Sequence, residues 1–316
     1  MPDSSAAAIV LDWGTSRLRG WLLDDGGRVL CARTRDWGIR HLPDGGYAAA
    51  FADLALHWPR VPVLAAGMVG SRQGWREAPY VEAPATLQAL CASLVDVASN
   101  DGRCMSIVPG VRDDAGPDVM RGEETQVFGV LETHPSLAAD ALVILPGTHS
   151  KWVAVKDACI ARFATFMTGE LYGIVSRHSI LAMPDAAPEQ AADAHAAAFA
   201  RGLATARDSG AQGALARLFS ARVLMLEGRL APACVADYLS GLLIGEEWRA
   251  ALAADWLTVA RPLVLVGEPA LCARYRQAAA VFGAPEPLIV ADAAVHGLWR
   301  IARAATVAGK PLLEMC

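Results

Sequence analysis

The sequence has no apolar run long enough to cross a lipid bilayer. Apolar residues make up 54% of the 316 residues, and alanine contributes much of that share. A membrane-spanning helix needs about 20 consecutive apolar residues, and every apolar stretch of this chain is interrupted sooner. The first five residues, Met-Pro-Asp-Ser-Ser, contain no basic residue and do not resemble a secretory signal. We therefore expect a cytoplasmic protein that packs alanine-rich helices and has no membrane partner.

Cysteine pairs and runs of basic residues are also missing. The seven cysteines are scattered, none forms a Cys-x-x-Cys pair, and no histidine cluster has the spacing of a zinc site. We expect reduced thiols that pack as small apolar side chains. The net charge is −5 and no basic run occurs, which argues against a nucleic-acid partner.

The common glycine-rich nucleotide motifs are absent too, both the Walker-type loop and the dinucleotide pattern. In their place, an apolar strand ends on Asp12 and runs at once into Gly14, Thr15 and Ser16. Glycine lets the backbone approach a phosphate, and the hydroxyl and N–H groups can donate to its oxygens. Asp12 can hold a hydrated Mg²⁺ against the same phosphates. An ordinary turn between two strands explains the same residues.

A second copy of this pattern favours the nucleotide interpretation. The strand 141–145 runs into Gly147 and Thr148, and Leu145 stands where Asp12 stands in the first copy. One turn would then hold metal and phosphate, and the other would hold phosphate only. Such a repeat predicts two similar halves, each opening with a meander of three strands. The strands of the two meanders are expected at 6–11, 18–23 and 28–32, and at 141–145, 152–155 and 159–165.

The loop 71–80 is the candidate substrate site. It follows a buried strand and is rich in glycine, aromatic and hydrogen-bonding residues. Ligands of open α/β sheets bind at the carboxyl ends of parallel strands, and this loop leaves such an end. Arg72 can hold a carboxylate, Gln73 can bond a hydroxyl, and Trp75 or Tyr80 can pack on a sugar-like face. A surface loop anchored by one tryptophan is the alternative.

A helix predicted at 119–132 places a carboxylate on an apolar face. Glu124, Phe128 and Leu131 follow the helical spacing i, i+4, i+7, so Glu124 lies on the apolar stripe. A buried carboxylate is costly unless it is paired or used, which makes Glu124 a candidate general base. Glu123 can also reach a cleft. Solvated acids in a first helical turn, favoured by the helix dipole, are the alternative.

The polar stretch 113–118 is the candidate domain boundary, which gives domains 1–117 and 118–316. In the second domain the strand 263–266 ends at Gly267, and the helix that follows can admit an adenine with its N-terminus near the α-phosphate. Further helices are predicted at 46–58, 86–97, 188–209, 214–226, 231–253, 270–282 and 293–305.

Together these residues resemble the sugar-kinase/heat-shock-70/actin ATPase superfamily, and within it the 2-dehydro-3-deoxygalactonokinase family. The resemblance spans essentially the whole chain. It implies an α/β fold with two ribonuclease-H-like domains around an ATP cleft, mixed sheets flanked by helices, and a last helix free to pack back on the first domain. The blocks that carry it are Leu11–Ser16, Gly70–Trp75, Arg121–Gln126, Leu145–Trp152 and Thr168–Leu171.

The resemblance also implies residue roles. Many relatives carry a catalytic Asp at the start of the first connecting helix; Glu124 with Thr125 is the nearest match, and Glu123 stays open as the base. Gly267 lacks the paired glycine common in the adenosine segment. The nucleotide residues would be Asp12 (also on Mg²⁺), Gly14, Thr15 and Ser16 in the first phosphate segment, Gly147, Thr148, His149, Ser150 and Lys151 in the second, and Gly267 at the adenosine.

The implied function is an ATP-dependent kinase that phosphorylates the terminal 6-hydroxyl of 2-dehydro-3-deoxy-D-galactonate in D-galactonate catabolism, with ATP and Mg²⁺. Its partner would be the small sugar acid, and a homodimer is compatible with the resemblance. Two alternatives stay open: a kinase of another small sugar acid or polyol, and a hydrolytic ATPase or polyphosphatase of the same superfamily.

Overall fold

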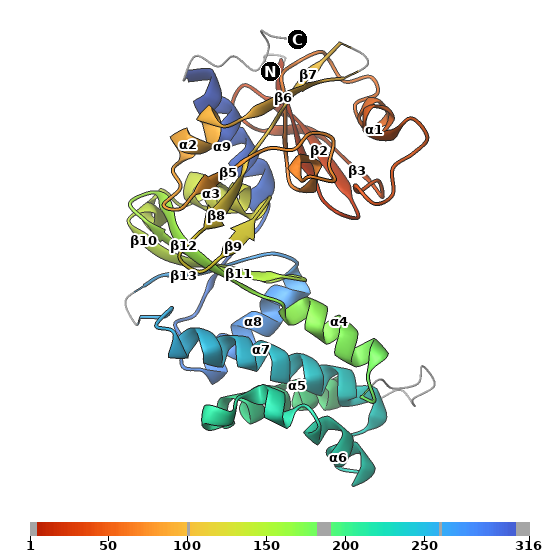
Figure 1. Cartoon of the computed structure of the whole chain (residues 1–316), viewed down its shortest axis with the longest axis vertical. Coiled ribbons are helices and arrows are strands. Elements are labelled where there is room, and N and C mark those ends of the chain that lie inside the picture. Colours follow the sequence, from red (N-terminus) through yellow and green to blue (C-terminus); the bar gives the residue numbers. More distant parts are fainter. Residues whose placement is uncertain (1–4, 100–101, 182–190, 259–260, 308–316) are drawn as a thin grey trace. The chain divides into compact units, whose positions relative to one another are not determined.

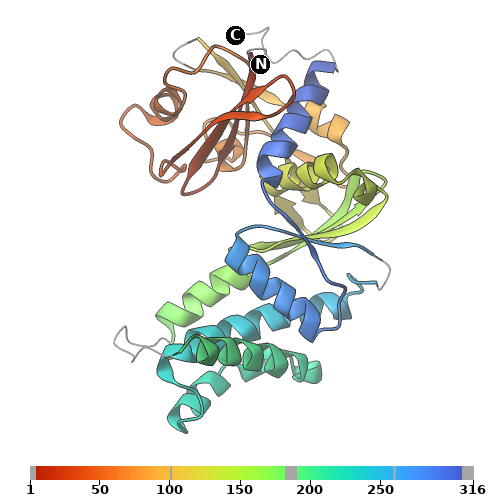
Figure 2. The ribbon, with the colours of Figure 1, turned by 180° about the vertical axis from the view of Figure 1, so that it is seen from behind.

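The computed structural model describes residues 5–99, 102–181, 191–258 and 261–307, which form two compact units (Figures 1 and 2). The first unit holds the described residues up to Asp140, residues Val153–Phe163 and the described chain from Ala291 onward. The second unit holds Ala141–Trp152 and Ala164–Val290. The last helix of the chain therefore belongs to the same unit as the first strand.

A six-stranded mixed sheet forms the first unit, in the order β3-β2-β1-β4-β7-β6. The central strand β1 is antiparallel to β2 and parallel to β4, and β3 completes the meander predicted from the sequence. Ile9, Leu11 and Trp13 of β1 are buried, and each such side chain contributes about 1.5–3 kcal/mol through burial. The strands are β1 Ala6–Trp13, β2 Leu18–Asp24, β3 Val29–Arg35, β4 Val63–Ala66, β6 Val95–Ala98 and β7 Cys104–Ile107.

The helix predicted at 86–97 is wrong in its second half. The helix α2 spans only Leu87–Ala92, and β6 then pairs antiparallel with β7. The segment Val95-Asp96-Val97-Ala98 alternates apolar and polar residues, which suits the edge of a sheet. The helix predicted at 46–58 is also shorter, since α1 spans Gly46–Leu54 and His57 has a left-handed φ of 66°.

A small three-stranded sheet, in the order β5-β8-β9, follows the substrate-loop candidate. The polar stretch 113–118 closes the β8–β9 hairpin, because Asp113 and Asp118 pair across the turn. The residues after this turn form a strand, so the helix predicted from Val119 begins only at Glu123. The bounds are β5 Tyr80–Glu82, β8 Gly110–Asp113, β9 Asp118–Met120 and α3 Glu123–Thr133.

The helices α3 and α9 (Ala293–Val307) pack side by side in the first unit (Figure 2). A Cβ atom on Gly129 would lie 1.8 Å from the carbonyl oxygen of Ala293, and one on Gly297 would lie 1.8 Å from that of Thr125. No larger residue fits at either glycine. The two backbones therefore cross in direct contact, which fixes the start of α3 relative to the sheet.

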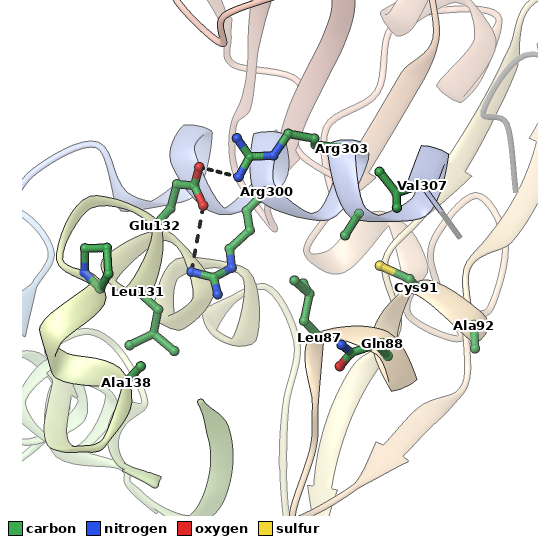
Figure 3. A pocket seen from close by; sticks show the side chains of 12 residues that line it. Leu87, Gln88, Cys91, Ala92, Leu131, Glu132, Ala138, Arg300, Arg303 and Val307 are labelled. Atoms are coloured by element: carbon green, nitrogen blue, oxygen red, sulfur yellow. Dashed lines mark hydrogen bonds and ion pairs between the residues drawn. The ribbon is translucent and has the colours of Figure 1, made fainter. Parts of the chain in front are cut away.

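The far end of α3 is tied to α9 by charge. Glu132 accepts a hydrogen bond from Arg303 at 2.8 Å and lies 3.8 Å from Arg300 (Figure 3). These three residues line a cavity of about 920 Å³ between α2, α3 and α9 that contains none of the predicted site residues. Exposed ion pairs of this kind contribute only about 0–1 kcal/mol, so the glycine contacts dominate the α3–α9 packing.

The second unit contributes strands to a five-stranded sheet, in the order β12-β11-β10-β13-β14, in which β10, β13 and β14 are parallel. These strands agree with the prediction. Helices α5 and α7 lie side by side beyond the sheet (Figure 1). The bounds are β10 Asp140–Leu145, β11 Ser150–Lys156, β12 Cys159–Phe166, β13 Leu263–Val266, β14 Leu288–Val290, α4 Thr168–His178, α5 Ala192–Arg207, α6 Ser220–Leu226, α7 Val235–Ala253 and α8 Pro269–Val281.

No helix in the described ranges is both long and apolar enough to cross a bilayer. Six cysteines fall within those ranges and carry free thiols, three of them buried. The start of the helix predicted from 188 lies outside the described residues.

Candidate active site

The first glycine turn lies where β1 ends. Gly14 donates its N–H to the carbonyl of Arg17 at 2.9 Å, which closes the β1–β2 hairpin, and Thr15 and Ser16 form its tip. Asp12 is the cross-strand partner of Arg19, and the two side chains form an ion pair. The Asp12 side chain is 19% exposed, so the carboxylate lies at the surface of the sheet's end. Arg19 was not predicted as a partner of Asp12, because their contact depends on how the strands β1 and β2 are aligned.

Two glycines bring the strand ends next to the start of α3. Gly67, directly after β4, has φ 96° and ψ −153°, a conformation open essentially to glycine. A Cβ atom there would lie 2.8 Å from the Trp13 carbonyl and 3.5 Å from Oδ1 of Asp12. A Cβ atom on Gly122 would lie 3.2 Å from the Gly67 Cα. The carboxyl ends of the parallel strands β1 and β4 and the N-terminus of α3 therefore meet at one place.

The two glutamates at this helix start have different environments. Glu124 is fully buried, as its place on the apolar stripe predicts, and Phe128 and Leu131 are buried with it. Its carboxylate accepts hydrogen bonds from the Gly122 N–H at 2.7 and 2.9 Å and from Thr125 at 3.1 Å. Burial, followed by the negative charge of Glu123, raises the pKa of Glu124 to about 8. Glu123 is partly exposed and accepts the Arg121 N–H at 3.0 Å.

The loop after β4 packs Trp75 against neighbouring aromatic rings and leaves Arg72, Gln73 and Tyr80 exposed. Trp75 stacks on Tyr47 at 5.9 Å and meets Trp13 edge-on at 6.0 Å. Gln73 has an exposed side chain, and its carbonyl accepts the Tyr47 hydroxyl at 2.7 Å. The Arg72 side chain is 88% exposed and lies 3.6 Å from Glu77. The loop therefore presents Arg72 to solvent rather than to a pocket.

Arg121 is the residue of this region that sequence reasoning did not single out. Its guanidinium lies 4.3 Å from the Tyr80 ring and donates to the Ala78 carbonyl at 2.8 Å. It therefore connects the start of α3 to the end of the substrate loop. It stands directly before Gly122 and Glu123, so its position in the Arg-Gly-Glu-Glu block was the available signal.

The second glycine turn is held by α4 in the second unit. Gly169 packs so closely on the turn that a Cβ atom would lie 2.4 Å from the Gly147 carbonyl. The Glu170 N–H donates to the Thr148 carbonyl at 2.9 Å, and its carboxylate contacts His149. Thr148 and His149 are exposed. The turn thus leaves its tip open to a ligand while its backbone is fixed from behind.

A buried carboxylate anchors the same turn from inside the second unit. Glu247 of α7 accepts hydrogen bonds from Trp152 at 2.7 Å, from Tyr275 at 2.6 Å and from Thr168. The Tyr275 hydroxyl in turn meets Ser150 at 2.8 Å. Burial raises the pKa of Glu247 although its hydrogen-bond donors oppose the shift. Lys151 is also buried, with Nζ 3.4 Å from the His149 carbonyl.

This turn borders a cavity of about 430 Å³ within the second unit. Gly147 and Thr148 line it on one side, and Glu268 and Leu271 at the start of α8 line it on another. Gly267 lies at the same junction, where a Cβ atom would be 3.4 Å from the Pro146 carbonyl. The volume is within the range of small-ligand pockets. The predicted phosphate and adenosine segments of the second half therefore meet around one cavity.

The structure thus gathers the predicted residues into two groups. In the first unit, Asp12 lies beside Gly67 and the start of α3, which carries Glu123 and Glu124, and the turn Gly14–Ser16 follows one residue after Asp12. In the second unit, Gly147 and Thr148 line the cavity and Gly267 directly precedes its lining residue Glu268, whereas His149, Ser150 and Lys151 continue the turn away from it. The arrangement places carboxylates at the strand ends of one unit and an exposed glycine turn beside a cavity in the other.

Comparison with known proteins assigns a family to this arrangement. The model of the 2-keto-3-deoxy-galactonokinase family matches residues 12–301. The 2-dehydro-3-deoxygalactonokinase of Escherichia coli (strain K12) is 36% identical over 305 residues, covering 95% of this chain and 99% of that protein. A crystal structure from Sinorhizobium meliloti, named provisionally as a 2-dehydro-3-deoxygalactonokinase, has a TM-score of 0.83 at 36% identity and covers 94% of this chain and 98% of its own.

A more distant structure supports the fold alone. The activator of the 2-hydroxyisocaproyl-CoA dehydratase of Clostridium difficile, solved with bound ADPNP, has a TM-score of 0.50 at 12% identity. It covers 98% of this chain and 99% of its own length.

Proposed function

Because the chain belongs to the 2-keto-3-deoxy-galactonokinase family, we propose that it transfers the γ-phosphoryl group of ATP to the terminal 6-hydroxyl of 2-keto-3-deoxy-galactonate (the 2-dehydro acid of the alternative name). This reaction belongs to D-galactonate catabolism, for which a cytoplasmic location is expected. The fold is the mixed α/β fold of the sugar-kinase/heat-shock-70/actin superfamily. The observation that carries the proposal is the family match together with the close approach of Asp12, Gly67 and Gly122, the residue directly before Glu123, at the ends of β1 and β4.

The different exposure of the two glutamates supports Glu123 as the general base. A base must come within hydrogen-bond distance of the hydroxyl proton. Glu124 is enclosed, and its pKa of about 8 keeps it mostly protonated at neutral pH. Glu123 is partly exposed and lies at the open end of the helix. Glu124 would therefore position the helix start through its bonds to Gly122 and Thr125, while the accessible carboxylate of Glu123 accepts the proton.

The residues at the end of β1 fit a magnesium–nucleotide complex. Mg²⁺ on a nucleotide uses one or two carboxylates plus phosphate oxygens and waters, and Asp12 supplies one carboxylate at the surface of the sheet's end. When bound, the ion would neutralise the growing charge on the phosphates. Arg19, which pairs with Asp12, adds a positive charge beside the Gly14–Ser16 turn.

The chain's own groups would then direct the transfer. Gly147 and Thr148 grip phosphate oxygens, and the cavity bordered by α8 takes the adenosine. Glu123 takes the proton of the terminal hydroxyl as its oxygen forms a bond to the γ-phosphorus and the bond to the β-phosphate oxygen breaks. Positioning and electrostatics supply most of the acceleration in such reactions, and orientation alone is worth up to ~7–11 kcal/mol.

An ADP-release assay with a panel of acceptors tests the proposal. We expect ADP release that depends on 2-keto-3-deoxy-galactonate, and much lower rates with other sugar acids and with polyols. If another acceptor were phosphorylated faster than 2-keto-3-deoxy-galactonate, that acceptor would be the substrate in place of the one proposed. ADP release of equal rate without any acceptor would mean a hydrolase, and the kinase proposal would be wrong.

A further inference from the structure

Arg121 carries a positive charge that the described chain does not neutralise. Its Nη2 donates to the Ala78 carbonyl at 2.8 Å, and the Tyr80 ring covers one face at 4.3 Å. Its Nε and Nη1 atoms are enclosed and have no hydrogen-bond partner among the described residues. Within those residues no carboxylate forms an ion pair with this guanidinium. Enclosed donors and an unpaired cation cost folding free energy, which indicates that a ligand completes them.

The location of this guanidinium connects it with the transfer site. The Arg121 N–H donates to Oε2 of Glu123 at 3.0 Å, so the residue stands directly beside the proposed base. Its side chain runs to the substrate loop, where a Cβ atom on Gly70 would lie 3.0 Å from Nη1. A six-carbon acid has its carboxylate and its terminal hydroxyl at opposite ends. One end can reach Glu123 while the other reaches this guanidinium.

We propose that Arg121 binds the carboxylate of the acceptor and thereby selects a sugar acid over a neutral polyol. This inference rests on the proposed kinase function and names the group that determines its substrate class. A guanidinium presents five N–H donors in a planar fork that matches a carboxylate, and the two enclosed atoms leave part of that fork unused. In this conformation Nε and Nη1 are closed to solvent and the Tyr80 ring, 40% exposed, covers one face of the guanidinium, so the carboxylate reaches the fork when this ring moves aside.

Arg72, the carboxylate partner predicted from the sequence, is less suited to this task. Its side chain is 88% exposed and already lies 3.6 Å from the Glu77 carboxylate. A charge contact in open solvent is screened and worth little, whereas an enclosed fork discriminates strongly between a charged and a neutral group.

The test compares two acceptors that differ only in charge, the sugar acid and its primary amide. In the wild type, kcat/KM should favour the acid by on the order of 10²-fold. Arg121→Gln should bring the ratio of the two close to one through a higher KM for the acid, with the KM for ATP unchanged. Arg121→Lys keeps the positive charge but not the planar fork, so its acid-to-amide ratio should lie between those of the wild type and Arg121→Gln. The matched control is Arg76→Gln, an exposed arginine of the same loop, which should keep the wild-type ratio.

A structural role alone gives a different result. If Arg121 only joined two segments, its substitution would lower activity on acid and amide alike and leave their ratio unchanged, which would overturn the inference. The inference would also be overturned if Arg72→Gln brought the acid-to-amide ratio of kcat/KM close to one while Arg121→Gln kept the wild-type ratio. Wild-type protein that phosphorylates neither acceptor would instead overturn the proposed function, and the selectivity inference with it.

Discussion

Glu124 gives the sharpest quantitative prediction, because its burial makes folding stability depend on pH. The carboxyl group is fully enclosed, and the Gly122 N–H and the Thr125 hydroxyl donate to it. Burial first, and the charge of Glu123 second, raise its pKa from 4.5 to about 8. The folded protein therefore holds a proton that the unfolded chain releases near pH 4.5.

The sign of the effect follows from this difference. Below pH 4.5 the carboxyl group is protonated in both the folded and the unfolded state, so it does not lower the free energy of unfolding there. Between about pH 4.5 and 8 the unfolded chain gains from ionisation and stability falls. The full loss is about 4–5 kcal/mol, of which about 3 kcal/mol is reached by pH 7. Glu124→Gln keeps the shape of the side chain but cannot ionise, so it should remove this fall of the free energy of unfolding with pH.

Urea unfolding at a series of pH values measures this directly. We expect the wild type to lose stability from pH 5 to 8 and Glu124→Gln to lose much less, so that the variant is the more stable protein at pH 8. Glu132→Gln on the same helix is the matched control, because it removes a carboxylate that is paired with Arg303 at the far end of the helix and keeps Glu124 (Figure 3). Parallel pH profiles for wild type and Glu124→Gln would refute the argument.

Substitutions at three further residues test the assigned roles. Glu123→Gln should lower kcat by ~10²–10⁴-fold with little change in the KM for ATP, as single-turnover rates can show; a kcat within a few-fold of wild type would exclude it as the base. Asp12→Ala should lose the Mg²⁺-dependent part of the rate in a magnesium titration, and an unchanged titration would remove it from the metal site. Glu247→Ala should raise the KM for ATP about tenfold by releasing the second glycine turn, while Glu247→Gln keeps most hydrogen bonds and most of the affinity. Equal effects of the two Glu247 variants would argue against this anchoring.

The parts of the fold that sequence predicts are those fixed by local pattern. The two strand meanders follow from apolar runs broken by glycine-rich turns, and both are confirmed. Glu124 was expected on the buried face of its helix from spacing alone, and it is fully buried. The helix prediction failed at 95–98, where Val95 and Val97 alternate with the polar Asp96 and the segment pairs with β7 as a strand. Such pairing is a tertiary effect that outweighs local propensity.

The missed site residues depend on partners that are distant in sequence. Glu247 lies in a long helix, and its donors Trp152, Thr168 and Tyr275 come from three other elements. No spacing along the chain links them. Arg121 is similar, because the Tyr80 ring that covers it belongs to a strand of another segment. The local sequence indicates a carboxylate block there, but only the fold shows which arginine is enclosed.

The central claim is phosphoryl transfer to the terminal hydroxyl of the sugar acid, and NMR of the product tests it most directly. After incubation of the wild type with ATP, Mg²⁺ and 2-keto-3-deoxy-galactonate, we expect one new phosphomonoester signal in the phosphorus spectrum, coupled to the methylene protons at carbon 6. Inorganic phosphate as the sole new signal, or a monoester at another carbon, would contradict the account.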